Sequence, residues 1–190
     1  MAAAEVEAHC GRRAGPTFGT IILMDVRLVN PFVVAVQRVF ESMVHTKTRI
    51  GKPTMRDNGT LSMHDVSGVI GFSGDAAGCV VLSFPMDVAC KIATAFAGIE
   101  IDAEHPDLTD AIGELTNMVA GNAKTHFEGL HISISLPSVI IGGHTITHPR
   151  QSPRIVIPCE TDLGSVAIEV CMTVGPEPSA KPAEVQGATV

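Results

Sequence analysis

The stretch Leu108–Phe127, LTDAIGELTNMVAGNAKTHF, has the residue pattern of an amphipathic helix. At about 100° per residue, its apolar side chains share one side of that helix. These residues are Leu108, Ile112, Leu115, Val119 and Ala123. A helix with one apolar face buries that face, so the stretch predicts a helix packed on the core of the domain.

The opposite side of this helix forms a narrow polar ridge. It consists of Asp110, Glu114, Asn117 and Gly121. Glycine inside a helix costs about 1 kcal/mol relative to alanine, and both Gly113 and Gly121 lie inside this one. Close packing against another helix would explain the glycines, and so would docking of a partner protein against the ridge.

The composition limits the class of protein. The 190 residues suffice for one ordinary domain, and 45% apolar residues suffice for its core. A formal charge of −7 argues against a nucleic-acid partner, because Lys and Arg are not in excess. The apolar run GTIILM (residues 19–24) is far too short to cross a membrane. Five cysteines, an odd number without a CxxC spacing, predict reduced thiols in a cytoplasmic protein.

The sequence pattern divides the chain into three parts. Residues 1–23 show no sustained period and precede a second methionine, Met24. They are therefore either a disordered extension or sequence upstream of the natural start. Residues 175–190 are rich in Pro, Ala and Glu and predict a disordered tail. The folded unit is then one domain over residues 24–174.

Two more helices and several strands are expected. Asn30 and Pro31 predict a helix start, with Asn30 as N-cap. A second helix is expected from Pro85 to Ala97, with Gly98 as C-cap. The predicted strands are 66–72 and 79–84 around the loop SGDAAG, 131–141, the hairpin 154–159 and 165–174, and an edge strand near 48–55. This order predicts an α+β domain with a mainly antiparallel sheet packed against about three helices.

The polar ridge resembles the signature of the CheC/CheX/FliY family of chemotaxis phosphatases. In that signature an Asp or Ser is followed by Glu, then Asn and finally Pro. Here these residues are Asp110, Glu114, Asn117 and Pro137. The segment from Met24, MDVRLVNPFVVAVQRVFESMV, is similar to the start of CheX proteins. The resemblance covers about residues 24–174, and one copy of the motif is typical of CheX rather than CheC.

The resemblance implies an enzyme that removes phosphate from the aspartate of a CheY-type response regulator in chemotaxis signalling. Asn117 would position the attacking water, and Glu114 would dock on a lysine of the regulator. Asp110 and Gly121 would contact this partner. The chain would need no cofactor or metal ion of its own, because the phosphorylated partner would hold magnesium. The alternative is a non-catalytic binding module for a response regulator or a flagellar switch component.

Assembly is also expected from the resemblance, since proteins similar to CheX form homodimers through sheet edges. The strands after Gly129 (HISISLPSVIIGG, RIVIPC and SVAIEVCMTV) are rich in Ile and Val and carry few charges. Open edges of that composition tend to associate, and two-fold pairing is the commonest closed arrangement. We therefore expect a homodimer.

Other residues with metal-ligating or nucleophilic side chains receive simpler interpretations. A metal site could be drawn from His131, His144, His148 and Cys159. Pro149 and the glycines before His144 interrupt a regular strand, so solvated loop histidines are the better interpretation. His126 is expected to be a partly buried histidine of the helix. Cys79 and Cys90 have no evident activating base and are expected in the core.

Overall fold

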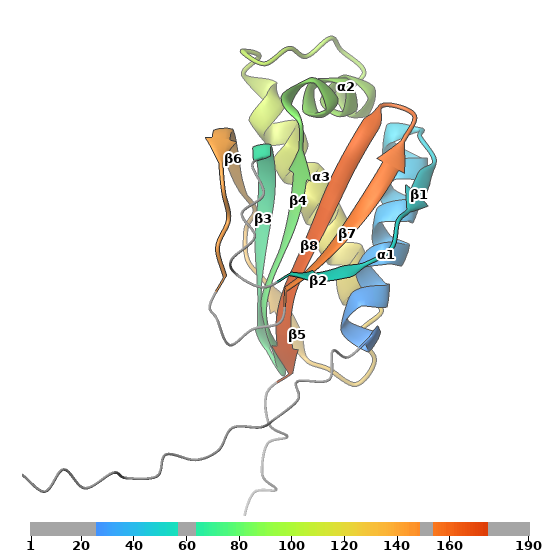
Figure 1. Ribbon diagram of the computed structural model, residues 1–190, viewed down its shortest axis with the longest axis vertical. Coiled ribbons are helices and arrows are strands. Elements are labelled where there is room, and N and C mark those ends of the chain that lie inside the picture. The colour runs from blue at the N-terminus through green and yellow to red at the C-terminus, as the bar shows by residue number, and fades with distance from the viewer. Residues whose placement is uncertain (1–25, 57–63, 149–153, 175–190) are drawn as a thin grey trace, which may run out of the picture.

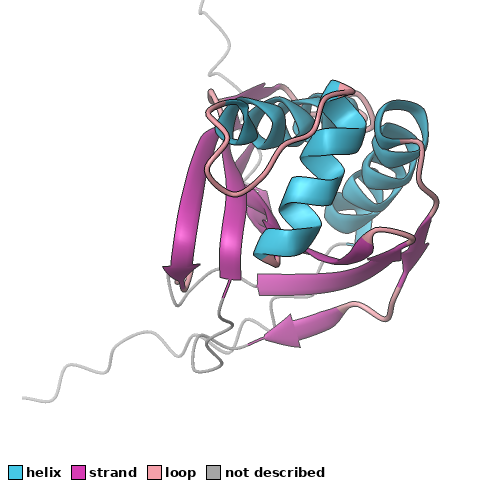
Figure 2. Ribbon diagram, turned by 90° about the horizontal axis from the view of Figure 1, so that it is seen from above, coloured by secondary structure: helices cyan, strands magenta, loops and turns pink. Residues whose placement is uncertain are grey.

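The computed structural model describes residues 26–56, 64–148 and 154–174. Within these ranges, three α-helices pack on one face of an eight-stranded sheet (Figures 1 and 2). The segments 1–23 and 175–190, for which disorder was predicted, lie outside the described residues. None of the described helices is long and apolar enough to span a membrane.

The helices follow the apolar periodicity of the sequence. They are α1 (Val26–Val39), which continues into one turn of π-helix, η1 (Phe40–Val44), then α2 (Met86–Ala97) and α3 (Asp107–Lys124). The predicted end of α2 is confirmed, because Gly98 adopts a left-handed conformation (φ 72°) and its amide bonds to the Thr94 carbonyl.

Helix α1 begins at Val26, so the predicted start at Asn30 is wrong. Pro31 lies inside the helix, where a proline costs about 3 kcal/mol because it cannot donate the helical hydrogen bond. Leu28 and Val29 are buried in the core, and burial of each such side chain stabilises the fold by about 1.5–3 kcal/mol. The extra turn is therefore favoured by its packing.

The predicted antiparallel sheet is confirmed, since every pairing among the described strands is antiparallel. The strands are β1 (Thr48–Ile50), β2 (Thr54–Arg56), β3 (His64–Gly74), β4 (Ala76–Phe84), β5 (Ile132–Ile134), β6 (Ser138–His144), β7 (Arg154–Thr161) and β8 (Gly164–Val174). Their order is β1-β7-β8-β4-β3-β5, with β2 also beside β7 and β6 also beside β3. Two short strands therefore form each edge of the sheet: β1 and β2 beside β7, and β5 and β6 beside β3.

Two predicted strands are divided in the structure. The run 131–141 becomes β5 and β6, which are separated at Pro137, a residue without an amide hydrogen for the ladder. The predicted edge strand 48–55 becomes β1 and β2. The β3–β4 hairpin is longer than predicted, because its strands reach Gly74 and Ala76 and leave only Asp75 in the turn.

The two faces of the sheet differ in their cover. Side chains alternate along each strand, and the even-numbered residues of β4 and β8 enter the core beneath the helices. They include Val80, Leu82, Phe84, Ile168 and Val170. The odd-numbered residues, among them Cys79, Val81, Glu169 and Cys171, lie on the face turned away from the helices, which we call the outer face.

Candidate functional site

Helix α3 presents the predicted ridge, and its ends are favoured by charge. Asp107 and Asp110 lie in the first turn and Lys124 in the last, where each sign of charge is favoured by the helix dipole. The predicted apolar face is confirmed, because Leu108, Ile112, Leu115, Val119 and Ala123 are all buried. The helix therefore has one fixed orientation on the sheet.

A close contact fixes the depth of α3 on the sheet. Thr116 is fully buried, and its hydroxyl donates to the Ile112 carbonyl at 2.7 Å. A Cβ added to Gly68 of β3 would lie 2.0 Å from Thr116 Oγ1. Only glycine at position 68 allows the helix to approach β3 this closely. Thr116 is the residue before Asn117, so this contact also fixes the ridge.

The polar residues of the ridge face outward, as predicted. Asp110 and Glu114 are exposed, and Asn117 is half-buried. In the described part of the chain, none of these three side chains is hydrogen-bonded or ion-paired to another residue. A carboxylate and an amide one turn apart are thus available to a group outside the chain.

The two glycines of α3 have different surroundings. A Cβ on Gly113 would lie 3.5 Å from Val139 Cγ2 and 3.8 Å from Pro137 Cγ, so this glycine is packed beneath the β5–β6 connection. A Cβ on Gly121 would meet nothing within 4 Å. These distances at Gly113 are ordinary van der Waals contacts, so no described contact requires glycine at either position.

The β5–β6 connection lies beside the ridge. Pro137, the last residue of the resemblance, packs against α3 at Gly113, directly before Glu114. Leu136 is 87% exposed, the highest value among the large apolar residues that the structure describes as exposed. An apolar side chain beside the ridge was not predicted, because the spacing from Asn117 to Pro137 does not reveal which neighbour of Pro137 faces solvent.

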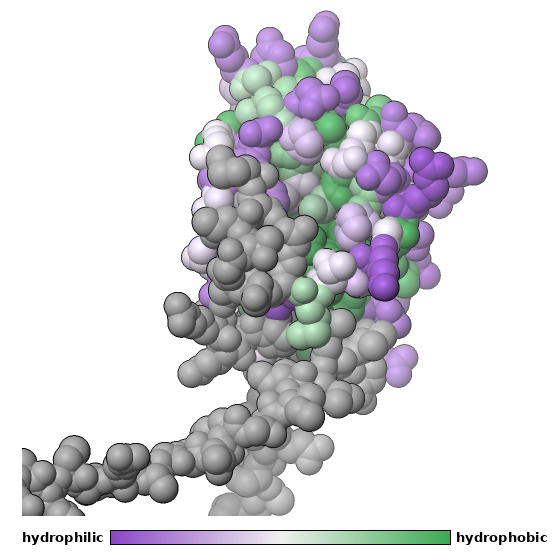
Figure 3. Space-filling view, in the orientation of Figure 1, coloured by the Kyte–Doolittle hydropathy of each residue, from purple (hydrophilic) through white to green (hydrophobic). Residues whose placement is uncertain are grey.

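The surface around the start of α3 is acidic. The α2–α3 connection carries exposed Glu100, Asp102 and Glu104. In the space-filling view, hydrophilic residues project from this upper end of the molecule (Figure 3). A negative surface at this end favours the approach of a partner with basic groups.

The outer face holds a buried charge cluster, which we define as Glu169, Arg154, His64 and His148. Arg154 donates from Nε and Nη2 to the two carboxylate oxygens of Glu169, each at 2.8 Å. His64 Nε2 lies 3.3 Å and His148 Nε2 3.5 Å from those oxygens. Burial acts to raise the pKa of Glu169, but bonding from His148 and Arg154 lowers it to about 2. Burial lowers the pKa of His64.

Contacts in and around this cluster correct three sequence-based interpretations. His148 is buried rather than solvated, because Glu169 provides the opposite charge that the sequence alone did not place there. Cys79 does have a histidine beside it, since its sulfur lies 3.6 Å from His148 Nδ1. His144, also assigned to solvent, instead contacts Ser67 Oγ through Nε2 at 2.9 Å. Among the described residues, no group of three or more His, Cys, Asp or Glu is arranged to hold a metal ion.

The predictions for the other histidines and cysteines are met in part. His126 is half-buried just beyond the end of α3, where its Nδ1 lies 2.9 Å from the Asn122 carbonyl. Cys90 is half-buried and packs against the core. The four cysteines in the described ranges are free thiols: Cys79, Cys90, Cys159 and Cys171.

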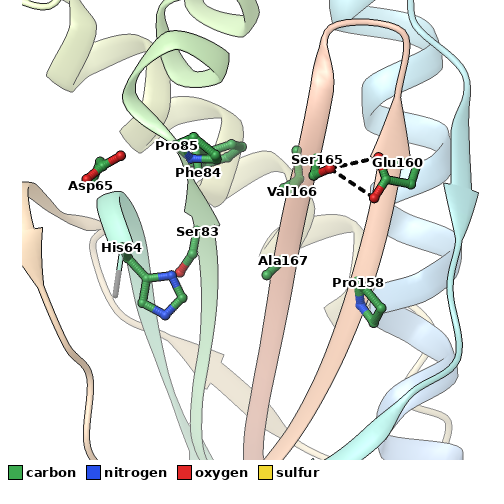
Figure 4. A pocket seen from close by; sticks show the side chains of 10 residues that line it. All are labelled: His64, Asp65, Ser83, Phe84, Pro85, Pro158, Glu160, Ser165, Val166 and Ala167. Carbon is green, nitrogen blue, oxygen red and sulfur yellow. Dashed lines mark hydrogen bonds between the residues drawn. The ribbon is translucent and has the colours of Figure 1, made fainter. Parts of the chain in front are cut away.

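A hollow of about 270 Å³ lies at one end of the outer face, beside the charge cluster (Figure 4). Its polar residues are bonded within the chain. Ser165 donates to both oxygens of Glu160 (2.9 and 2.8 Å), and Ser83 is bonded to Ser67. Asp65 accepts from the Met86 amide. The hollow therefore offers few unbonded polar groups, in contrast to the ridge of α3.

Comparisons with known proteins agree with this fold and ridge. The family model for the chemotaxis phosphatase CheX matches residues 66–160. The CheY-P phosphatase CheX of Thermotoga maritima is 31% identical over 122 residues, which make up 63% of this chain and 78% of that protein.

Solved structures show the same architecture. The crystal structure of a chemotaxis protein CheX from Desulfovibrio desulfuricans has a TM-score of 0.70 at 32% identity, over 78% of this chain and 99% of that one. A chain in the CheX–CheY–BeF3–Mg²⁺ complex from Borrelia burgdorferi has a TM-score of 0.65 at 21% identity, over 76% and 97% of the two chains. These likenesses confirm the predicted fold class.

Proposed function

The chain belongs to the CheX family of chemotaxis phosphatases, and we propose on that basis that it hydrolyses the aspartyl phosphate of a CheY-type response regulator. One observation supports the assignment of residues. Glu114 and Asn117 project from the same ridge of α3 and have no hydrogen-bonding partner in the described part of the chain. Polar groups without internal partners are available to a docked protein.

The chemistry requires positioning more than covalent catalysis. Hydrolysis of an acyl phosphate needs a water in line with the bond that breaks, and stabilisation of the charge on the phosphoryl group. The Asn117 amide has both a donor and an acceptor, so it can orient this water without titrating. We assign Asn117 as the catalytic residue that positions the water.

Glu114 lies one turn before Asn117 and has a different role in this proposal. Its carboxylate pairs with a lysine of the regulator and so fixes the insertion of α3. Asp110 adds negative charge at the same end of the ridge, and Gly121 leaves room for the partner surface one turn beyond Asn117. Leu136 supplies an apolar contact beside them.

The metal ion belongs to the partner in this proposal. The complex from Borrelia burgdorferi contains CheY, BeF3 and Mg²⁺ together with CheX. The residues proposed here provide one carboxylate and one amide, which suits contact with a partner better than holding a magnesium ion. The chain itself then acts without a cofactor, and the cytoplasmic location expected from the sequence is part of the same proposal.

Homodimer formation through a sheet edge also remains a proposal. Strand β6 lies at one border of the sheet, and its Ile140 and Ile141 are 39% and 44% exposed. The other two apolar runs named in the sequence, β7 and β8, lie inside the sheet and cannot provide a free edge. Light scattering should give twice the 19.9 kDa mass of the chain, and a mass near 19.9 kDa would contradict the dimer.

The function is tested by phosphate release from CheY-type regulators charged with acetyl phosphate. The wild-type chain should accelerate release. Asn117→Ala should abolish that acceleration and still bind, while changing stability by no more than about 0.5 kcal/mol. Asn30→Ala, which alters an exposed asparagine of α1, is the matched control and should keep full activity.

Glu114→Ala separates docking from chemistry. It should raise the regulator concentration needed for half-maximal rate, because loss of one partner of a desolvated ion pair costs about 2 kcal/mol or more. Binding of regulators without any acceleration by the wild-type chain would instead favour the non-catalytic binding module. Wild-type turnover by Asn117→Ala would contradict the role of Asn117.

A further inference from the structure

Two cysteines face each other on the outer face of the sheet. Cys79 of β4 and Cys171 of β8 are direct partners in the antiparallel register. Directly opposed residues of antiparallel strands point to the same face, and their Cα atoms lie about 4.5–5.5 Å apart. A disulfide joins Cα atoms about 4.4–6.8 Å apart. The register therefore places the two Cα atoms within the range of separations that a disulfide spans.

The surroundings of this pair are cationic. His148 Nδ1 lies 3.6 Å from Cys79 Sγ, and the other ring nitrogen lies 3.5 Å from a Glu169 oxygen. Arg154 of β7 is the direct register partner of Cys171 on its other side. The imidazole of His148, oriented by the Glu169 carboxylate, is therefore placed to donate a hydrogen bond to the sulfur of Cys79.

The protonation of His148 agrees with this arrangement. Hydrogen bonds to the sulfurs of Cys171 and Cys79, and to Glu169, raise the pKa of His148 to about 11. The imidazole is then a cation at neutral pH, beside both sulfurs. The two thiols differ in access, since Cys79 is half-buried and Cys171 is buried.

The other described cysteines lack these features. Cys159 faces the core beneath the helices, and its burial, together with the charge of Glu160, raises its pKa to about 12. Cys90 lies on α2, where burial and then the charges of Asp102 and Asp87 raise its pKa. In the described strands Cys159 is paired in register with Ile50 and Val166 rather than with a second cysteine, and Cys90 lies on a helix. Disulfide formation is therefore expected to be selective for the pair on the outer face.

We propose that Cys79 and Cys171 are a redox-active dithiol that a peroxide converts into a cross-strand disulfide. The Cys79 thiolate attacks one peroxide oxygen, and the O–O bond breaks. Cys79 becomes a sulfenic acid, and the leaving oxygen takes a proton to become water when the oxidant is hydrogen peroxide. The Cys171 sulfur, after loss of its proton, then attacks the sulfenic sulfur, and the S–O bond breaks as the disulfide forms. The departing hydroxide takes up a proton and leaves as a second water.

The reverse step requires a dithiol reductant, which is oxidised as the two cysteine thiols are restored. The site is independent of the proposed phosphatase chemistry, because the ridge of α3 lies on the other side of the sheet. Disulfide formation would remove the thiol that contacts His148. It would therefore change the surroundings of His148, which is a member of the buried charge cluster.

The test uses the full chain treated with hydrogen peroxide, then denatured, alkylated and analysed by mass spectrometry. The wild type should lose two hydrogen masses and retain three of its five alkylatable thiols. After digestion with trypsin, which does not cut before Pro182, the disulfide should hold the peptide 57–91 and the peptide 155–190 together. A dithiol reductant should reverse the change.

Each linked peptide contains two cysteines, so variants are needed to assign the bond. Cys79→Ser and Cys171→Ser should each abolish the link, while Cys90→Ser and Cys159→Ala should keep it. Alkylation of both Cys79 and Cys171 in oxidised wild type, under conditions that oxidise a small dithiol, would overturn the proposal. A link that survives in Cys79→Ser would overturn it as well.

Discussion

Replacement of Gly68 by alanine tests whether the contact between β3 and α3 holds the ridge in place. A Cβ on Gly68 would lie 2.0 Å from Thr116 Oγ1 and 2.9 Å from Thr116 Cβ. Real Cβ atoms essentially never approach other heavy atoms within 3.0 Å. The helix and the strand must therefore move apart, or Thr116 must change its rotamer.

The expected cost follows from these contacts. Overpacking of a well-filled core costs about 1–3 kcal/mol. If Thr116 rotates, its 2.7 Å hydrogen bond to the Ile112 carbonyl is also lost, which costs about 1 kcal/mol more. A total of about 2–4 kcal/mol would lower the Tm by about 4–16 °C for a domain of this size. The phosphatase rate should fall too, because Asn117 follows Thr116 on the displaced helix.

Urea and thermal unfolding followed by circular dichroism measure this effect. Gly71→Ala is the matched control on the same strand, since its added Cβ would meet its nearest neighbour, Ser135 Oγ, at 3.6 Å. It should change stability by less than about 1 kcal/mol. Thr116→Ala in the Gly68→Ala background removes the closest atom, so the double variant should be more stable than the two single changes predict. Equal unfolding midpoints for Gly68→Ala and Gly71→Ala would refute the reasoning.

Three further predictions concern the charge cluster and the ridge. Glu169→Gln should destabilise the fold by about 3–5 kcal/mol in urea unfolding, because it removes the buried negative charge that pairs with both Arg154 and His148; an unchanged midpoint would contradict this. The lowered pKa of Glu169 makes its stabilisation disappear as the pH falls from about 4.5 toward 2. The lowered pKa of His64 adds a loss of stability below about pH 6.5, and the raised pKa of His148 adds a loss as the pH rises from about 6.5 toward 11. Urea midpoints should therefore decline on both sides of neutral pH, and a midpoint that is constant from pH 2 to 11 would exclude these shifts. Gly121→Ala should stabilise α3 by up to about 1 kcal/mol, yet raise the regulator concentration for half-maximal rate; unchanged binding would show that Gly121 does not face the partner.

The helices and the sheet could be predicted because their signals are local. The period of α3 places its buried side correctly, and Gly98 marks the end of α2. The start of α1 could not be predicted from the Asn30–Pro31 pair. Its position depends on the burial of Leu28 and Val29 against residues far away in the sequence, which exceeds the local preference of proline.

The outward direction of Glu114 and Asn117 was also predictable, since it follows from the same helical period. The close contact of Gly68 with Thr116 was not, because it depends on which residue of β3 lies beneath α3. The charge cluster also leaves a signal in the sequence. Arg154 and Glu169 are charged residues inside the apolar runs RIVIPC and SVAIEVCMTV, and charged residues are almost never fully buried unless paired.

The two polar groups of this domain differ in a way that bears on function. In the charge cluster, Arg154 and Glu169 bond to each other at 2.8 Å, and loss of either would break a buried ion pair. On the ridge, Glu114 and Asn117 have no bonding partner in the described chain, and their removal should cost the fold little. The stability of the fold therefore does not explain Glu114 and Asn117, nor Gly121, which lies inside α3 and costs about 1 kcal/mol relative to alanine. A docked partner explains all three residues: its basic group pairs with Glu114, its phosphoryl group is attacked by the water that Asn117 orients, and its surface occupies the space beside Gly121. For this reason the ridge, and not the charge cluster, is assigned to the phosphatase reaction.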